Sequence, residues 1–150
     1  MANSYTNCLY HIVFSTKKRQ PLLTAEIRER LWPYLGGLAR ERRIIPLMIG
    51  GVADHVHLLL VIPTTLAPAK AIQEIKAFSS RWFHETFPEL AGFAWQEGYG
   101  AFTIGESQKG QTINYIATQV EHHRKTTFEE EIVAFLKKNN INYDDRYLLG

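Results

Sequence analysis

The chain has 150 residues, of which 45% are hydrophobic and 21% are charged, a balance that excludes a disordered or low-complexity protein. Its single cysteine excludes an intrachain disulfide framework, and no apolar run reaches the length of a membrane span. The net charge of +2 permits a polyanionic partner without requiring one. The length leads us to expect one domain over residues 1–150. We expect it in the cytoplasm, because no apolar leader is visible and cysteine is scarce.

Hydrophobic periodicity predicts strands and helices that alternate along the chain. Thr24 is placed to cap the first helix, in which Pro33 and the pair Gly36 and Gly37 mark a kink or break. A capping box of Thr127 and Glu130 opens the last helix. Strands are expected at residues 5–16, 44–53, 55–63 and 101–107, and helices at residues 25–43, 66–87, 112–125 and 126–141.

This order, β-α-β-β-α-β followed by two helices, predicts the fold class. It is typical of an α+β protein with a ferredoxin-like or RRM-like antiparallel sheet. In that arrangement the two crossover helices cover one sheet face and the other face is free, with the C-terminal helices added to the core unit.

The stretch ADHVHLLL, residues 53–60, places two histidines at the start of an apolar strand. Side chains alternate along a strand, so Val56 and Leu58 point to one face while His55 and His57 lie together on the other. Neighbouring same-face side chains are roughly 6–7 Å apart, close enough for two imidazoles to bind one cation. Asp54 could turn to orient one of them. In the alternative interpretation, one histidine is satisfied by the backbone and the other is exposed.

The helix expected at residues 112–125 carries Tyr115 and Gln119, which are four residues apart and share a face. A phenol nucleophile with an amide oxygen one turn away suits phosphoryl transfer at a metal ion. Simple amphipathic packing is the competing interpretation of each residue alone. The acidic run EEEIV, residues 129–133, is interpreted as an ordinary first helical turn that complements the helix dipole.

The chain resembles the HUH single-tyrosine transposases of the insertion-sequence 200/605 family and their REP-associated relatives. The resemblance covers most of the sequence, through YHIVFSTKKRQPLL, DHVHLLL, IKAFSSRWF, WQEGYGAFTIGES and INYIATQ. It implies that His55, His57 and Gln119 bind a divalent ion, Mg²⁺ or Mn²⁺. It also implies that Tyr115 attacks single-stranded DNA, forming a 5′-phosphotyrosine link and releasing a 3′-OH.

The same resemblance implies a homodimer that recognises DNA hairpins at element ends, with the tyrosine helix often serving the partner's histidines. Candidate phosphate contacts are basic residues on two segments, and four aromatic residues could stack on bases, although we expect two or more of the four in the core. The basic candidates are Lys17, Lys18, Arg19, Lys76 and Arg81, and the aromatic ones are Phe93, Trp95, Tyr99 and Phe102.

Two other functions compete with strand transfer. A catalytically inactive or domesticated relative would bind hairpin DNA without cutting it. A phosphodiesterase-like protein would use the histidine pair with water and leave no protein-linked product.

Overall fold

The computed structural model describes residues 3–148 and follows the predicted order of elements. Two antiparallel strands lie in the middle of one sheet and two lie at its edges, in the order β2-β3-β1-β4. The strands are β1 (Leu9–Ser15), β2 (Ile45–Val52), β3 (His55–Val61) and β4 (Gly100–Ile104), and the helices are α1 (Ala25–Glu41), α2 (Pro68–Thr86), α3 (Lys109–Ala117), α4 (Gln119–His122) and α5 (Phe128–Lys138).

The antiparallel α+β prediction is confirmed, and the sheet order explains the burial of β3. This strand pairs with β1 on one side and β2 on the other, so both of its edges lie inside the sheet. Its register places His57 opposite Val13 and His55 opposite Ser15. The histidine pair therefore lies at the start of a central strand of the sheet.

The face of the sheet that carries Val56, Leu58 and Leu60 packs under α1 and α2, as the alternation along β3 predicts. All three side chains are buried in one apolar cluster with residues from both helices, including Leu31 and Ile75. This cluster contains most of the apolar core, and burial of its surface provides the main stabilisation of the fold.

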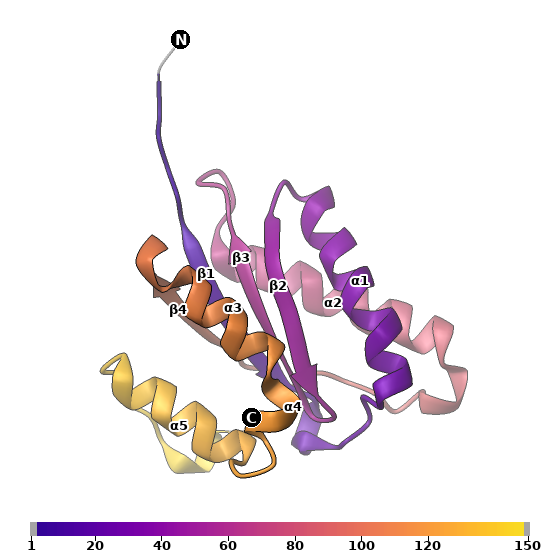
Figure 1. Ribbon diagram of the computed structural model, residues 1–150. Helices are drawn as coiled ribbons and strands as arrows, with labels where there is room; N and C mark the ends of the chain where they lie inside the picture. Colours follow the sequence, from indigo (N-terminus) through magenta and orange to yellow (C-terminus); the bar gives the residue numbers. More distant parts are fainter. Residues whose placement is uncertain (1–2, 149–150) are drawn as a thin grey trace.

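The opposite face is not free, and that expectation is wrong. Helices α3 to α5 lie across it (Figure 1), with α3 packed against β2 and β3. A second, smaller apolar cluster joins Val13 and Phe102 of the sheet to Phe128 and Ile132 of α5. The polar histidines are therefore enclosed between the sheet and a second helical layer.

Two helices differ from the prediction. Helix α1 runs without a break through Pro33 and both glycines. The helix expected at residues 112–125 instead divides at Thr118, whose φ and ψ are −105° and 25°. The Thr118 hydroxyl donates to the Asn114 carbonyl, a side-chain bond that competes with regular helical bonding.

The close approach of α3 to β2 depends on Gly50. A Cβ added at this position would lie 2.7 Å from the carbonyl oxygen of Ile116, a backbone atom that cannot move alone. We expect Gly50→Ala to lower the free energy of unfolding by about 1–3 kcal/mol, because α3 must shift. Urea denaturation measures this change.

Gly37→Ala in α1 is the matched control, because nothing lies within 4 Å of the added Cβ. It should raise the free energy of unfolding by about 0.5–1 kcal/mol through helix propensity. Equal effects of the two substitutions would show that α3 does not lie against β2 as described.

Within residues 3–148, none of the helices combines the length and the apolar character needed to cross a bilayer.

Candidate metal and nucleophile site

His55 and His57 are both fully buried, and each ring is oriented by a partner on its Nδ1 atom. His55 Nδ1 lies 2.7 Å from Oδ1 of Asp54, and His57 Nδ1 lies 2.8 Å from Nε2 of His11 on β1. With the Nδ1 atoms engaged, both Nε2 atoms face the same space beneath α4 and α5. Orientation of this kind is what a metal-binding histidine requires.

Glu131 of α5 occupies that space. Its Oε1 atom lies 2.9 Å from His57 Nε2 and 3.2 Å from His55 Nε2, and the residue is 3% exposed. EEEIV does form the first turn of α5, as expected, but Glu131 is buried at the centre, which that interpretation did not predict. Glu131 falls at helical spacing from Phe128 and Phe135, so the sequence contained a signal, a carboxylate on the apolar face of an amphipathic helix.

His123, in the connection between α4 and α5, adds a third imidazole. Its Nδ1 bonds to the Thr126 carbonyl at 2.6 Å, and its Nε2 lies 3.2 Å from Oε2 of Glu131. That Nε2 is buried and has no hydrogen-bond partner in the described part of the chain. Ligand atoms of His55, His57, His123 and Glu131 all lie within 4.8 Å of one another, so these residues could hold a metal ion.

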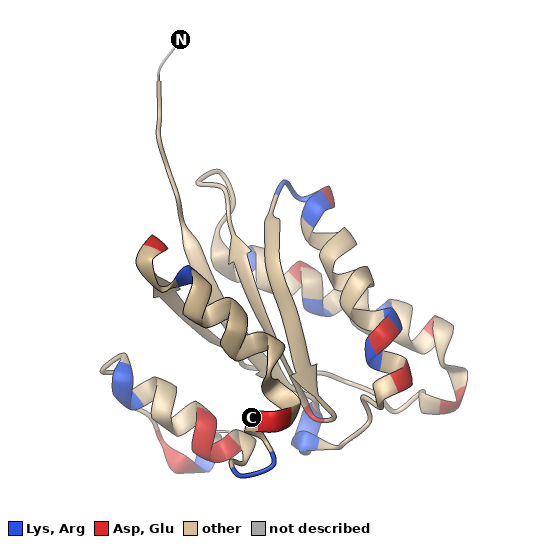
Figure 2. Ribbon diagram, viewed as in Figure 1, with Lys and Arg blue, Asp and Glu red and all other residues tan. Residues whose placement is uncertain are grey.

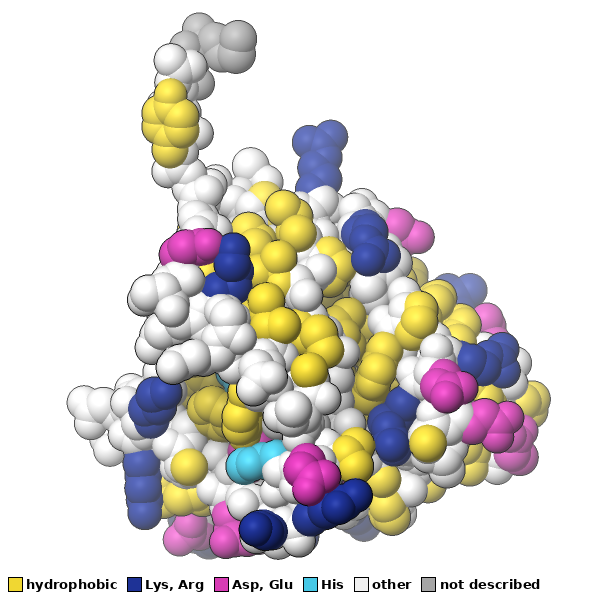
Figure 3. All heavy atoms as spheres, viewed as in Figure 1, with side chains coloured by type: hydrophobic (Ala, Val, Ile, Leu, Met, Phe, Trp, Pro, Cys, Tyr) yellow, Lys and Arg dark blue, Asp and Glu magenta, His cyan; other side chains and the backbone are white. Residues whose placement is uncertain are grey.

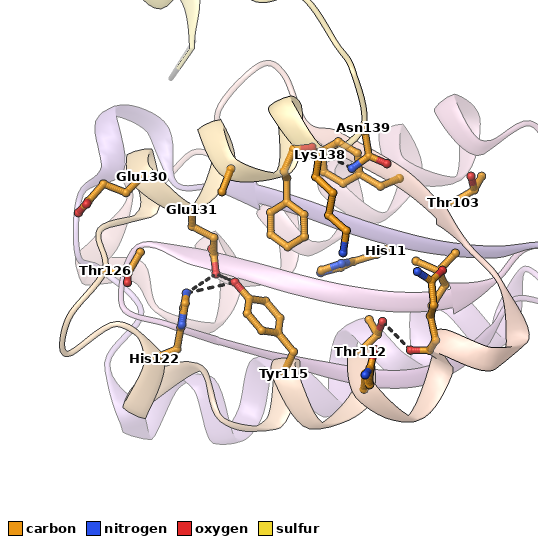
Figure 4. A pocket seen from close by; sticks show the side chains of 16 residues that line it. His11, Thr103, Thr112, Tyr115, His122, Thr126, Glu130, Glu131, Lys138 and Asn139 are labelled. Atoms are coloured by element: carbon orange, nitrogen blue, oxygen red, sulfur yellow. Dashed lines mark hydrogen bonds and ion pairs between the residues drawn. The ribbon is translucent and has the colours of Figure 1, made fainter.

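Tyr115 and Gln119 reach the same centre from α3 and α4. The Tyr115 hydroxyl donates a hydrogen bond to Oε2 of Glu131, and His122 Nε2 lies 3.2 Å from the same hydroxyl oxygen (Figure 4). Gln119 donates its amide to the Tyr115 carbonyl at 3.2 Å, which leaves its Oε1 atom 3.3 Å from His55 Nε2. The structure therefore brings together all four residues that the sequence singled out, from three separate elements of one chain.

Burial and the contacts with Glu131 set the charges at this centre. Burial opposes ionisation of Glu131, but contacts with His123, His55 and His57 outweigh it and hold its pKa well below the ordinary range. Burial alone would lower the pKa of His55, yet its hydrogen bonds to Asp54 and Glu131 raise it to about 8. Burial lowers the pKa of His57, which favours the neutral ring that a metal ion binds.

The surroundings of Tyr115 favour the neutral, protonated form of its phenol. Burial raises the pKa of Tyr115, and the hydrogen bond to Glu131 raises it further. The hydroxyl therefore keeps its proton in the protein alone. A cation at the centre would offset the negative charge that opposes its ionisation.

The Asp54 carboxylate contacts the centre directly at His55, through Nδ1 of the ring. We expect Asp54→Asn to weaken the binding of Mn²⁺ about 10- to 100-fold, because the His55 ring loses the carboxylate that fixes its orientation. Calorimetric titration with Mn²⁺ measures the effect. Asp144→Asn is the control, since Asp144 is exposed and pairs with Arg146. Unchanged affinity in Asp54→Asn would show that His55 is not a ligand.

The predicted phosphate contacts fall on two sides of the sheet. Lys17, Lys18 and Arg19 form a short helical turn after β1, and the preceding Thr16 bonds to the Asp54 carbonyl at 2.9 Å. Arg19 and His123 both act electrostatically on Asp54, so this basic turn lies at the metal-site end of the sheet (Figure 2). It remains a predicted DNA contact.

Lys76 and Arg81 lie on α2, across the sheet from Tyr115. Three backbone carbonyls of residues 96–98 accept hydrogen bonds from the Lys76 ammonium, at 2.6, 3.2 and 2.9 Å, and burial lowers its pKa to about 8. Arg81 pairs with Glu85 at 3.3 Å. Lys76 therefore anchors the 96–98 loop, and neither residue lies on the face that carries the candidate site.

Three of the four aromatic candidates belong to the protein interior. Phe93, Trp95 and Phe102 are buried, which confirms the expectation that two or more belong to the core, while Tyr99 is 44% exposed. Histidine side chains likewise reach the surface of the viewed face only in small patches (Figure 3). Tyr115, His122 and Glu131 line a cavity beside the centre.

Comparison with known proteins identifies relatives of this sequence. A family model described as "Transposase IS200 like" matches residues 4–119. The transposase for insertion sequence element IS200 of Salmonella typhimurium is 30% identical over 129 residues, covering 83% of this chain and 84% of the relative. The ISDra2 transposase TnpA of Deinococcus radiodurans is 27% identical over 115 residues, covering 73% and 82%.

Two solved structures resemble the fold. A candidate transposase crystallised from Deinococcus radiodurans has a TM-score of 0.65 and 26% identity, over 79% of this chain and 96% of that one. A REP-associated tyrosine transposase bound to a REP hairpin has a TM-score of 0.60 and 16% identity, over 82% and 73%. The second likeness concerns the fold alone. The family match ends at Gln119, so His123 and Glu131 lie beyond it.

Proposed function

The chain belongs to the IS200-like transposase family, and from this premise we propose that it cleaves and rejoins single-stranded DNA through a covalent 5′-phosphotyrosine at Tyr115. One observation carries the proposal. Glu131 contacts the Tyr115 hydroxyl and the Nε2 atoms of His55 and His57, which come from separate elements. The Gln119 amide oxygen lies beside the same His55 Nε2 atom. A nucleophile beside a candidate metal centre suits phosphoryl transfer.

The reaction conserves the energy of the phosphodiester. The Tyr115 oxygen loses its proton and bonds to phosphorus as the bond from phosphorus to the 3′ oxygen breaks, and the released strand end takes one proton as its 3′-OH. Attack by a 3′-OH on the phosphotyrosine reverses the step, so rejoining needs no nucleotide triphosphate. Before attack, Glu131 Oε2 accepts a hydrogen bond from the phenol and orients it.

The donor set fits a divalent ion. His55, His57 and Gln119 would supply two imidazole nitrogens and an amide oxygen, and His123 and Glu131 lie where they would complete the set. An ion held by these residues would supply positive charge that polarises the scissile phosphate and offsets the Glu131 charge that raises the Tyr115 pKa. We propose Mg²⁺ or Mn²⁺, and the imidazole nitrogens favour Mn²⁺ of the two.

The proposed substrate is single-stranded DNA with a hairpin at element ends. Support comes from the REP hairpin in the structurally similar tyrosine transposase. The chain would act in the cytoplasm, as one domain and as a homodimer. In the single chain, Tyr115 lies beside the histidines of its own chain, with ring centroids of Tyr115 and His57 5.7 Å apart.

A denaturing gel of the DNA reaction tests this function. Hairpin oligonucleotides labelled at the 3′ end are incubated with the protein and Mn²⁺, and we expect label to migrate with the protein. An inactive DNA-binding relative would leave the oligonucleotide whole. A hydrolase that uses water would release a shortened labelled strand without any protein-linked product, and either result would refute strand transfer.

A further inference from the structure

A cavity of about 470 Å³ opens between α3 and α5, and Tyr115 and Glu131 are among the residues that line it (Figure 4). His11 and Phe102 of the sheet also line it. The volume lies in the range typical of small-molecule sites, which combine apolar walls with a few convergent polar groups. Whatever occupies this cavity lies next to the proposed nucleophile.

One wall of the cavity is aromatic. The rings of Phe102 and Phe135 stack with centroids 5.3 Å apart and planes inclined by 15°. The Phe135 ring is also 5.9 Å from the ring of Tyr115, so the aromatic wall continues to the nucleophile. Planar, apolar side chains of this kind are the surfaces on which unstacked nucleobases pack.

Two polar groups in the cavity have their donors available. Gln111 lies one helical turn before Tyr115 on the same face of α3, and its amide makes no hydrogen bond within residues 3–148. Lys138 reaches toward the neutral ring of His11 (Figure 4) and forms no ion pair with any described residue. The cavity therefore offers an amide that could read a base edge and a cation that lacks an anion.

We propose that this cavity holds one unstacked nucleobase of single-stranded DNA, from a nucleotide that flanks the phosphate attacked by Tyr115. The inference rests on the proposed function and assigns a specificity site to it. Phe135 supplies the stacking wall, Gln111 pairs with the base edge, and Lys138 binds a neighbouring phosphate. The protein then selects its cleavage position partly by direct contact with one base.

Sequencing of covalent adducts tests the role of Gln111. The protein reacts with Mn²⁺ and a pool of hairpin-bearing DNA in which the single-stranded bases beside the hairpin are randomised, and the DNA attached to it is sequenced. We expect a preference at one base next to the linked phosphate, reduced about ten-fold in Gln111→Ala. Gln73→Ala on α2, across the sheet, should keep the preference. Adducts without any base preference, or with the same preference in Gln111→Ala, would overturn the proposal.

A second measurement does not depend on cleavage. Tyr115→Phe protein is titrated with each of the four deoxynucleoside monophosphates and followed by amide chemical shifts in NMR. Shifts should concentrate around the cavity, and Lys138→Ala should weaken binding about five-fold or more, while Lys137→Ala should not. Identical shifts with inorganic phosphate, or none in the cavity, would overturn the base site.

The two measurements separate this inference from the proposed function. Nucleotide binding in the cavity without any covalent adduct would refute the proposed function and retain the base site. Adducts at Tyr115 without nucleotide binding in the cavity would refute the base site and retain the proposed function.

Discussion

Tyr115→Phe is expected to reduce the yield of covalent protein–DNA adduct by about 10³-fold or more, because no other atom at the centre can replace the phenolic oxygen. The substitution removes one hydrogen bond to Glu131, which keeps its contacts with His55, His57 and His123. The fold and hairpin binding should therefore persist. Gel electrophoresis with 3′-labelled DNA measures the adduct.

Tyr5→Phe is the matched control, since Tyr5 is 91% exposed and lies outside the sheet and helices. It should form adducts at the wild-type yield. Adducts at wild-type yield in Tyr115→Phe would mean that another residue attacks the DNA.

His57→Ala is expected to weaken the binding of Mn²⁺ at least about 100-fold and to abolish metal-dependent cleavage. The His57 ring connects His11 to Glu131 through its two nitrogens, at 2.8 and 2.9 Å. Its removal takes away a ligand and leaves a buried carboxylate with one partner fewer, which should also cost about 1–3 kcal/mol of stability. Calorimetry with Mn²⁺ and urea denaturation measure the two effects separately.

His84→Ala separates lost ligation from lost stability. His84 of α2 bonds to the Phe93 carbonyl at 2.6 Å, so its removal should also destabilise the protein. Binding of Mn²⁺ should nevertheless remain at the wild-type level. Wild-type affinity for Mn²⁺ in His57→Ala would show that His57 is not a ligand of the metal ion.

Local patterns in the sequence were sufficient to predict the sheet and the orientation of β3. Alternation along this strand separates Val56 and Leu58 from the histidines, and the Thr24 and Thr127 caps start α1 and α5 as expected. Short-range rules suffice here because the period of a strand and the geometry of a cap are set by adjacent residues.

The positions of Glu131 and His123 at the centre could not be predicted from local patterns. Glu131 meets His57 only because α5 docks on the sheet through Phe128 and Ile132, a packing arrangement between residues far apart in sequence. His123 comes into place after the helix break at Thr118, which helical periodicity does not reveal. Both residues also lie beyond the family match, so resemblance does not point to them.

Peptide mass spectrometry of the wild-type adduct tests the central claim most directly. The adduct formed on single-stranded DNA is digested with nuclease and protease, and the modified residue is identified by fragmentation. We predict a nucleotide 5′-phosphate attached to the Tyr115 oxygen. A nucleotide on any other residue, or cleaved DNA with no modified peptide, would contradict the account.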